Sequence, residues 1–278
     1  MEHFTREGLT FDVADSPAHG VAKGTVVLLH GFPQTSSSWR KVSPLLNDAH
    51  YRTVAPDQRG YSPRARPKGR APYRTTELVA DTVALIDQLG DGPVHLVGHD
   101  WGAAVAWGLA SSHPELLRSL TTVSVPHPGA FLKSFLSSSQ ALHSWYMAAF
   151  QPPLVPDLLL DRFPGVLDEL LRRSGMDDDQ LTDVHRLIES GGLTGALNWY
   201  RAMMLSTPPA LARRVAVPTT HVWGARDTAL VRRGAELAAD YVIADYRLEV
   251  LTGAGHWIPE HDAEELATIV LERIAASH

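Results

Sequence analysis

The sequence predicts an α/β fold, in which helices cover both faces of a mostly parallel central sheet and an all-helical segment is inserted. Two observations predict this class. Short apolar strands alternate with helices over the first 125 residues and again after residue 219, which is typical of a parallel sheet buried on both faces. Between residues 127 and 207 the chain shows helical patterns and no convincing strand.

The first half contains four predicted strands, each a short run rich in aliphatic and β-branched residues. They cover residues 25–29, 51–55, 94–97 and 120–125. A helix is predicted over 76–89, where apolar residues fall on one side, and another over 102–111, which is rich in small residues. This alternation of strands and helices is what indicates a parallel sheet.

The second half has helices over 131–136, 139–150, 181–189 and 193–205, and then strands over 219–223 and 247–251. A final helix is predicted over 263–276. A helical insert in an α/β chain is most simply a cap over the carboxyl edge of the sheet, where ligands bind. We therefore expect a core domain of residues 1–127 and 208–278 and a helical cap domain of residues 128–207.

Composition excludes several classes of protein. The 278 residues carry a net charge of −6, which argues against a broad nucleic-acid surface, and they include no cysteine, which excludes disulfides and thiolate chemistry. The longest uncharged apolar segment, residues 101–110, has half the length of a membrane span, and the first residues lack the pattern of a signal peptide. We expect a soluble, cytoplasmic protein without membrane insertion, for which a homo-oligomer stays open.

Two runs of charge are expected to be structural. Residues 59–74 carry arginines and a lysine without an acid, broken by prolines, and are predicted to form a solvated loop. Asp177–Asp179 is predicted to begin a helix, because carboxylates are favoured near helix N-termini.

The most informative segment is a strand, a tight turn and a helix around Asp100. The turn Gly98–Gly102 reads Gly-x-Asp-x-Gly, which is the nucleophile-elbow pattern with aspartate where a serine hydrolase carries serine. Such an elbow lifts Asp100 to a helix N-terminus, where an anion is favoured and needs no base to activate it. By itself the segment is equally compatible with a plain aspartate N-cap.

Three further segments favour the catalytic interpretation. Asp227 follows the strand over 219–223, and His256 follows the strand over 247–251. The loop His30–Pro33 follows the first buried strand and could present a backbone N–H. Nucleophile, acid and histidine thus occur in the order Asp100, Asp227, His256, each just past the carboxyl end of a strand. This ordered set predicts a catalytic triad.

With these motifs, nearly the whole chain resembles an epoxide hydrolase of the α/β-hydrolase fold. The matching segments are His30–Pro33, Asp57–Tyr61, Gly98–Gly102, Asn198–Arg201 and Gly255–Trp257. Gly60–Pro63 departs locally from the usual pattern of that family. The resemblance implies that Tyr200 and, on a looser Tyr-x-x-x-Phe match, Tyr146 are the two acid tyrosines of the cap. From the residues alone, each would be a packing residue.

The resemblance implies a two-step reaction that yields a vicinal diol. Asp100 attacks a ring carbon and forms a covalent alkyl ester, while Tyr146 and Tyr200 hold and protonate the ring oxygen. His256, oriented by Asp227, then activates the water that hydrolyses the ester.

The resemblance also assigns the remaining site residues. The backbone N–H groups of Phe32 and Trp101 form the oxyanion hole, and a cis Phe32–Pro33 peptide bond helps to aim the first of them. The side chains of Phe32, Trp101, Phe150 and Trp257 are expected to bind substrate. The partners are a small apolar epoxide and water, and neither a metal nor an organic cofactor is expected.

The main alternative is a haloalkane dehalogenase-like hydrolase that uses the same aspartate nucleophile. Trp101 lies where one halide-binding indole would lie, but Phe32 occupies the position of the second halide donor and has no side-chain N–H. Asp100 excludes a serine esterase, and a non-catalytic receptor or scaffold would leave the triad without a role.

Overall fold

The computed structural model describes residues 1–205 and 213–277. Its eight-stranded sheet has the order β1-β2-β4-β3-β5-β6-β7-β8, and the predicted α/β-hydrolase fold class is confirmed. β2 pairs antiparallel with β1 and β4, and every pairing from β4 to β8 is parallel. The strands are β1 (His3–Arg6), β2 (Leu9–Ser16), β3 (Gly24–Leu29), β4 (Tyr51–Pro56), β5 (Val94–His99), β6 (Leu117–Val123), β7 (Thr219–Gly224) and β8 (Tyr246–Leu251).

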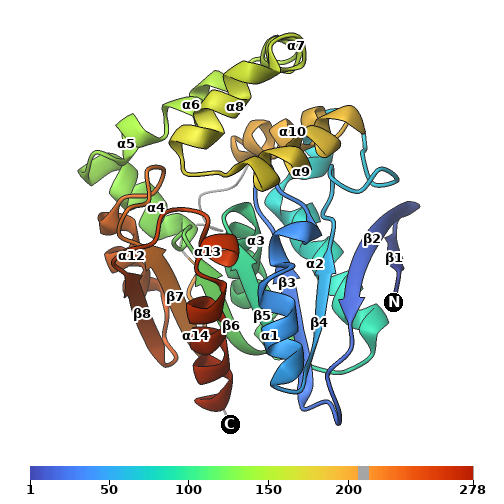
Figure 1. Cartoon of the computed structure of the whole chain (residues 1–278). Helices are drawn as coiled ribbons and strands as arrows, with labels where there is room; N and C mark the ends of the chain where they lie inside the picture. Colours follow the sequence, from blue (N-terminus) through green and yellow to red (C-terminus); the bar gives the residue numbers. More distant parts are fainter. Residues whose placement is uncertain (206–212, 278) are drawn as a thin grey trace.

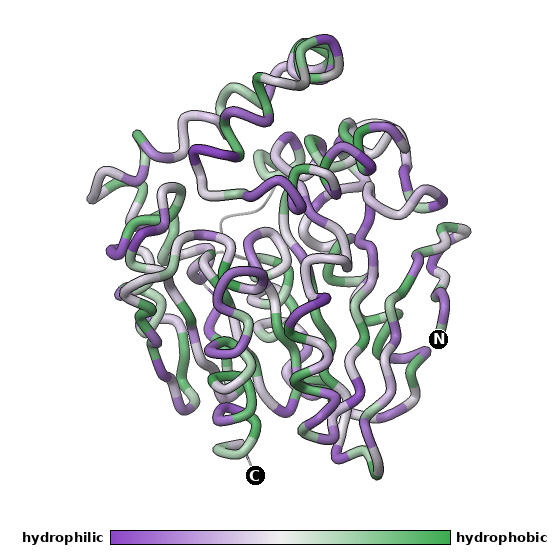
Figure 2. Tube along the Cα trace, viewed as in Figure 1, coloured by the Kyte–Doolittle hydropathy of each residue, from purple (hydrophilic) through white to green (hydrophobic). Residues whose placement is uncertain are grey.

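Helices cover both faces of this sheet (Figure 1). Along β3, Val26 and Leu28 pack with α1 and α14, whereas Val27 and Leu29 pack with α2 and α3. This alternation follows from the two-residue period of a strand. Figure 2 shows hydrophobic residues along the central strands and hydrophilic ones in the outer loops. The helices around the sheet are α1 (Val42–Asp48), α2 (Thr75–Leu89), α3 (Trp101–Ser112), α12 (Arg232–Leu237), α13 (Ile258–His261) and α14 (Ala263–Ala275).

A helical segment lies over the carboxyl ends of the parallel strands (Figure 1). Its helices are α4 (Pro128–Ser137), α5 (Gln140–His143), α6 (Trp145–Ala149), α7 (Val155–Arg162), α8 (Pro164–Arg173), α9 (Asp178–Glu189) and α10 (Leu193–Met203). Leu197 and Trp199 of α10 belong to the hydrophobic cluster that contains Leu29 and Val105 of the core. The division into core and cap domains stays a prediction, and its second boundary, at 207/208, lies outside the described residues.

Short one-turn helices complete the fold. They are η1 (Ser36–Trp39), η2 (Ala71–Tyr73), η3 (Pro114–Leu116) and η4 (Ala238–Tyr241). Within residues 1–205 and 213–277, no helix is both long and apolar enough to cross a membrane.

Several local expectations can be compared with these elements. Asp177 caps α9 as expected and forms a capping box with Gln180. The predicted helix over 139–150 is divided at Ser144 into α5 and α6. The expectation of a solvated loop over 59–74 is wrong for Arg59, which is buried because its guanidinium forms two hydrogen bonds with the carboxylate of Asp81.

Candidate active site

The turn between β5 and α3 places Asp100 at the carboxyl edge of the sheet, with φ 50° and ψ −119°. Both neighbouring glycines are required by close backbone approach. A Cβ at Gly98 would lie 2.4 Å from the carbonyl oxygen of Gly102, and one at Gly102 would lie 2.1 Å from that of Leu29. The local chain therefore has the geometry of the predicted nucleophile elbow.

Asp100, Asp227 and His256 come together at this edge. His256 Nδ1 lies 2.8 Å from Asp227 Oδ2, and His256 Nε2 lies 3.6 Å from Asp100 Oδ2. The other oxygen of Asp227 accepts hydrogen bonds from the backbone N–H groups of Ala229 and Leu230 at 2.8 and 2.9 Å. Asp227 is thus fixed on one side by its own loop and orients the imidazole on the other.

Electrostatics make Asp100 and His256 an ion pair before substrate binds. Burial alone would lower the pKa of His256, but the carboxylates of Asp227 and Asp100 outweigh it and raise that pKa to about 10. Burial likewise opposes ionisation of Asp100, yet its interaction with the neighbouring imidazolium of His256 lowers the pKa of the carboxyl. An aspartate nucleophile is therefore ionised at neutral pH.

A backbone donor already holds one oxygen of the nucleophile. The N–H of Phe32 donates to Asp100 Oδ1 at 2.8 Å, and the Phe32–Pro33 peptide bond is cis. Trp101 is the first residue of α3, so its N–H belongs to the helix-start amides that have no partner within the helix. Both N–H groups of the predicted oxyanion hole thus lie beside Asp100 in the chain or in space.

The two predicted acid tyrosines come from different cap helices and meet near Asp100. The rings of Tyr146 in α6 and Tyr200 in α10 are 6.0 Å apart, and Phe150 and Phe32 pack against Tyr200 at 5.2 and 5.1 Å. Burial raises the pKa of each hydroxyl above its ordinary value, and the nearby charge of Asp100 raises it further. Both hydroxyls therefore stay protonated at neutral pH.

A cavity of about 320 Å³ lies between the sheet edge and the cap. Its lining includes Asp100, His256, Tyr146 and Tyr200. The predicted substrate-binding residues Phe32, Phe150 and Trp257 also line it. Trp101 is absent from this lining, and its indole packs edge-on against Trp199 and Tyr200 instead. Within the described ranges, no group of three His, Asp or Glu side chains is arranged to hold a metal ion.

Comparison with known proteins places this site in a family. Residues 24–263 match the family described as alpha/beta hydrolase fold. The chain is 34% identical to Epoxide hydrolase 2 of Caenorhabditis elegans over 269 residues, which cover 91% of this chain and 74% of that protein. The chain belongs to the epoxide hydrolase family of the α/β hydrolases. It is also 36% identical to the AB hydrolase superfamily protein YfhM of Bacillus subtilis, over 95% of this chain and 94% of that protein.

A solved structure supports the same assignment. A mutant of an epoxide hydrolase from Bacillus megaterium, crystallised with a naphthyloxy-propanediol product, superposes with a TM-score of 0.85 at 25% identity. The match covers 98% of this epoxide hydrolase and 99% of the bacillar chain. The similarity therefore includes the cap helices as well as the sheet.

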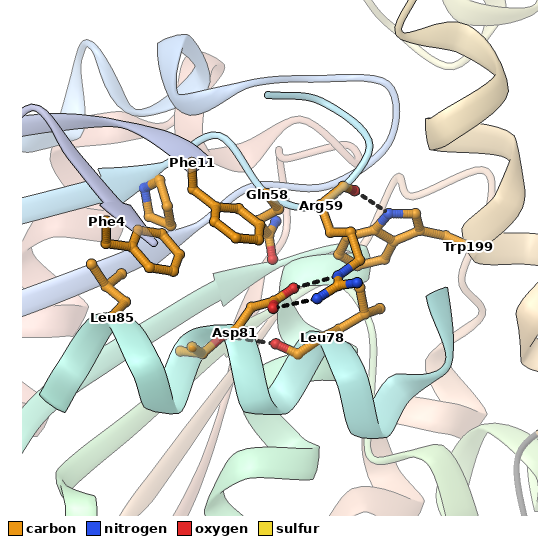
Figure 3. Close-up of a pocket in the computed structure, with 10 residues that line it drawn as sticks. Phe4, Phe11, Gln58, Arg59, Leu78, Asp81, Leu85 and Trp199 are labelled. Atoms are coloured by element: carbon orange, nitrogen blue, oxygen red, sulfur yellow. Dashed lines mark hydrogen bonds and ion pairs between the residues drawn. The ribbon is translucent and has the colours of Figure 1, made fainter. Parts of the chain in front are cut away.

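Side chains beneath the cap fix α10 of this epoxide hydrolase to the core (Figure 3). The indole of Trp199 donates to the backbone carbonyl of Arg59 at 2.8 Å, and the guanidinium of Arg59 is held by Asp81 in turn. Trp199 precedes Tyr200, so this contact fixes the position of the helix that carries one tyrosine.

Other contacts near the triad were not predicted from the sequence. Ser124 Oγ donates to the backbone carbonyl of His256, and His99 Nε2 lies 2.9 Å from the same oxygen. Gln140 of α5 donates to Ala229 O at 2.7 Å and accepts from the N–H of Val231 at 2.9 Å, on either side of Leu230. These are polar contacts between distant segments, for which a single sequence has no periodic signal.

The cavity wall also contains residues that the sequence did not single out. Leu167, Leu170 and Leu171 project into this wall from α8. The three leucines follow an i, i+3, i+4 spacing, which is the signal of an apolar helix face. That spacing predicts burial, but only the fold shows that the face borders a cavity.

Proposed function

We propose that this epoxide hydrolase opens small apolar epoxides to vicinal diols through an alkyl ester on Asp100. The observation that carries the proposal is one cavity lined by the nucleophile, the histidine and both cap tyrosines. A nucleophile for carbon and proton donors for oxygen are the two groups that epoxide opening needs. The mainly apolar wall of this cavity supports an apolar substrate.

The geometry assigns separate roles to the two oxygens of Asp100. Oδ1 is bound to the Phe32 N–H, so Oδ2 is the atom that attacks a ring carbon. As that carbon–oxygen bond breaks, Tyr146 and Tyr200 donate hydrogen bonds to the ring oxygen, and one of them transfers its proton. Oδ1 then becomes the carbonyl oxygen of the ester.

Ester formation neutralises Asp100 and so lowers the pKa values of the tyrosines and of His256, which prepares the second step. The carboxylate of Asp100 helps to raise the pKa of both tyrosines and of His256. Its conversion to a neutral ester removes that contribution, so the tyrosines become better acids while the alkoxide forms. The imidazolium of His256 becomes a stronger acid in the same event, so its proton is available to the tyrosinate.

Hydrolysis of the ester uses the same contacts again. Neutral His256, oriented by Asp227, takes a proton from a water that attacks Cγ of Asp100. Negative charge then develops on Oδ1, where the Phe32 N–H already points. Collapse of this intermediate releases the diol and restores the carboxylate. A cytoplasmic location stays a prediction from the sequence.

Replacing His256 by glutamine should stop the reaction at the ester. Glutamine cannot take a proton from water, so hydrolysis should slow by about 10²–10⁴-fold, whereas attack by Asp100 needs no base. After mixing His256→Gln with styrene oxide, intact-protein mass spectrometry should show an increase equal to the whole substrate. Peptide analysis should locate the added mass on Asp100.

The same experiment separates epoxide opening from dehalogenation. A bromoalkane adds only its alkyl group, because halide leaves as the ester forms. Faster ester formation from a bromoalkane than from styrene oxide would favour the dehalogenase alternative. An adduct away from Asp100, or retained turnover without an adduct, would contradict the assigned roles; Asp100→Ala/His256→Gln is the control that should form no adduct.

A further inference from the structure

Glu260 lies in α13, four residues after His256, and only 3% of the residue is exposed to solvent. One carboxyl oxygen, Oε2, accepts hydrogen bonds from the side-chain amides of both Gln34 and Gln180. Three segments therefore meet at a single carboxyl group. These are α13, which directly follows the loop of His256, the loop that carries Phe32, and the cap helix α9.

The cap side of this junction is rigidly oriented. Gln180 Oε1 accepts from the backbone N–H of Asp177 at 2.8 Å, and His261 Nε2 lies 3.0 Å from the same oxygen. These contacts identify Oε1 as the acceptor end of the Gln180 amide. Its Nε2 must then face Glu260, so the assignment of oxygen and nitrogen in the Gln180 amide is fixed by its other contacts.

The core side of the junction contains an unsatisfied acceptor. Gln34 follows Phe32 by two residues, and its side-chain oxygen Oε1 is buried without a hydrogen-bond partner among the described residues. An orphaned buried acceptor is costly, which makes a missing donor the simplest explanation. A carboxylic acid can form two hydrogen bonds with one amide, because it accepts from the N–H and donates to the C=O.

We propose that Glu260 is a positioning residue. As the neutral acid it donates a hydrogen bond to Gln34 Oε1 while it accepts one from Gln180, and these bonds connect the cap to the loops of Phe32 and His256. The inference rests on the proposed function, because this connection between cap and core affects the reaction only if the cap tyrosines must be held near Asp100. Ionisation of Glu260 removes the donor and places a negative charge beside the oxygen of Gln34. The connection between the cap and the core then weakens.

The charged groups around Glu260 leave its carboxyl without a direct cationic partner among those described. Lys41 Nζ donates to the backbone carbonyl of Glu260, and Arg40 pairs with Asp183 of α9. The titratable groups facing the junction from the adjoining elements are Arg40, Lys41, Asp177, Asp183 and His261. Burial raises the pKa of Glu260 to about 7, although Gln180, Arg40 and Gln34 act to lower it.

Because the pKa of Glu260 is raised, the stability of the junction should fall as the pH rises. A carboxyl whose pKa is raised on folding stabilises the fold fully below its ordinary value of 4.5, and this contribution is lost as pH rises through about 7. The junction should therefore loosen between pH 6 and about 8. The tyrosines stay protonated over this range, since their pKa values are raised, and attack by Asp100 does not require neutral His256.

The test is the single-turnover rate of ester formation on Asp100, measured by rapid quenching and mass spectrometry from about pH 5.5 to 9. In the parent this rate should fall about two- to tenfold, the size of one hydrogen bond. In Glu260→Gln it should stay at the parent's acidic value, because the amide can donate to Gln34 and accept from Gln180. Glu264→Gln, at an exposed glutamate of α14, should keep the parent's profile.

Thermal unfolding gives a second reading that needs no substrate. The melting temperature of the parent should fall more between pH 6 and about 8.5 than that of Glu260→Gln. Identical pH profiles for the two proteins would overturn the proposal. A parent rate that rises with pH above that of Glu260→Gln would also overturn it, since the carboxylate would then be the active form. If neither protein forms an ester, the proposed function fails, and the melting curves still decide the role of Glu260.

Discussion

Asp100→Ala should lower kcat for epoxide hydrolysis by at least about 10⁴-fold, because no other group at the site can form the ester. The fold should persist, since alanine removes the carboxylate and little of the hydrophobic core. Initial rates of diol formation, with circular dichroism and a melting curve on the same sample, check both expectations. Asp179→Ala, at an exposed acid in the first turn of α9, is the matched control and should keep the parent rate.

A purified, folded Asp100→Ala that opens epoxides at a tenth of the parent rate would contradict the covalent mechanism. It would mean that His256 activates water for direct attack on the ring. In that case the contact between the Phe32 N–H and Asp100 Oδ1 would have only a structural role.

Tyr146→Phe and Tyr200→Phe should each slow ester formation by about 10²-fold or more, the effect of a lost general acid. A ring-opened alkoxide is a poor leaving group and needs a proton. Phenylalanine keeps the aromatic contacts with Phe150 and Phe32, so the melting temperature should change little. The double variant should be nearly inactive, as measured by single-turnover mass spectrometry.

Tyr241→Phe is the control for the tyrosine series. Tyr241 stacks on His127 at 4.3 Å, away from the cavity lining, so loss of its hydroxyl should leave the rate unchanged. A double variant of Tyr146 and Tyr200 with undiminished turnover would contradict the acid roles. That result would be decisive if the parent also released halide from a bromoalkane faster than it formed diol.

The parts of the site that lie at strand ends could be predicted from the sequence. Asp100, Asp227 and His256 each follow an apolar strand, and parallel strands bring their carboxyl ends to one edge. Gly98 and Gly102 marked the elbow because no side chain fits there. Tyr146 and Tyr200 were different, since a helical tyrosine has the pattern of a packing residue and only the family resemblance indicated more.

The contacts that hold the site in place could not be predicted. Glu260 and Gln34 are 226 residues apart in sequence, and nothing in their local patterns links them. The expectation of a solvated loop is wrong at Arg59 for a similar reason. Arg59 is buried against Asp81, which lies on the following helix α2 and has no local pattern that links it to Arg59. The edge strand β1 and its neighbour β2 could not be predicted, since their buried apolar residues are few, Phe4 and Phe11 among them.

The central claim, that water attacks the ester and not the epoxide, is tested most directly by one turnover in water labelled with heavy oxygen. With enzyme in excess over styrene oxide, the diol should carry no label, because its new oxygen comes from Oδ2 of Asp100. The label should appear instead in the peptide that contains Asp100, where water has attacked Cγ. Label in the diol of the first turnover, with none in that peptide, would contradict the account.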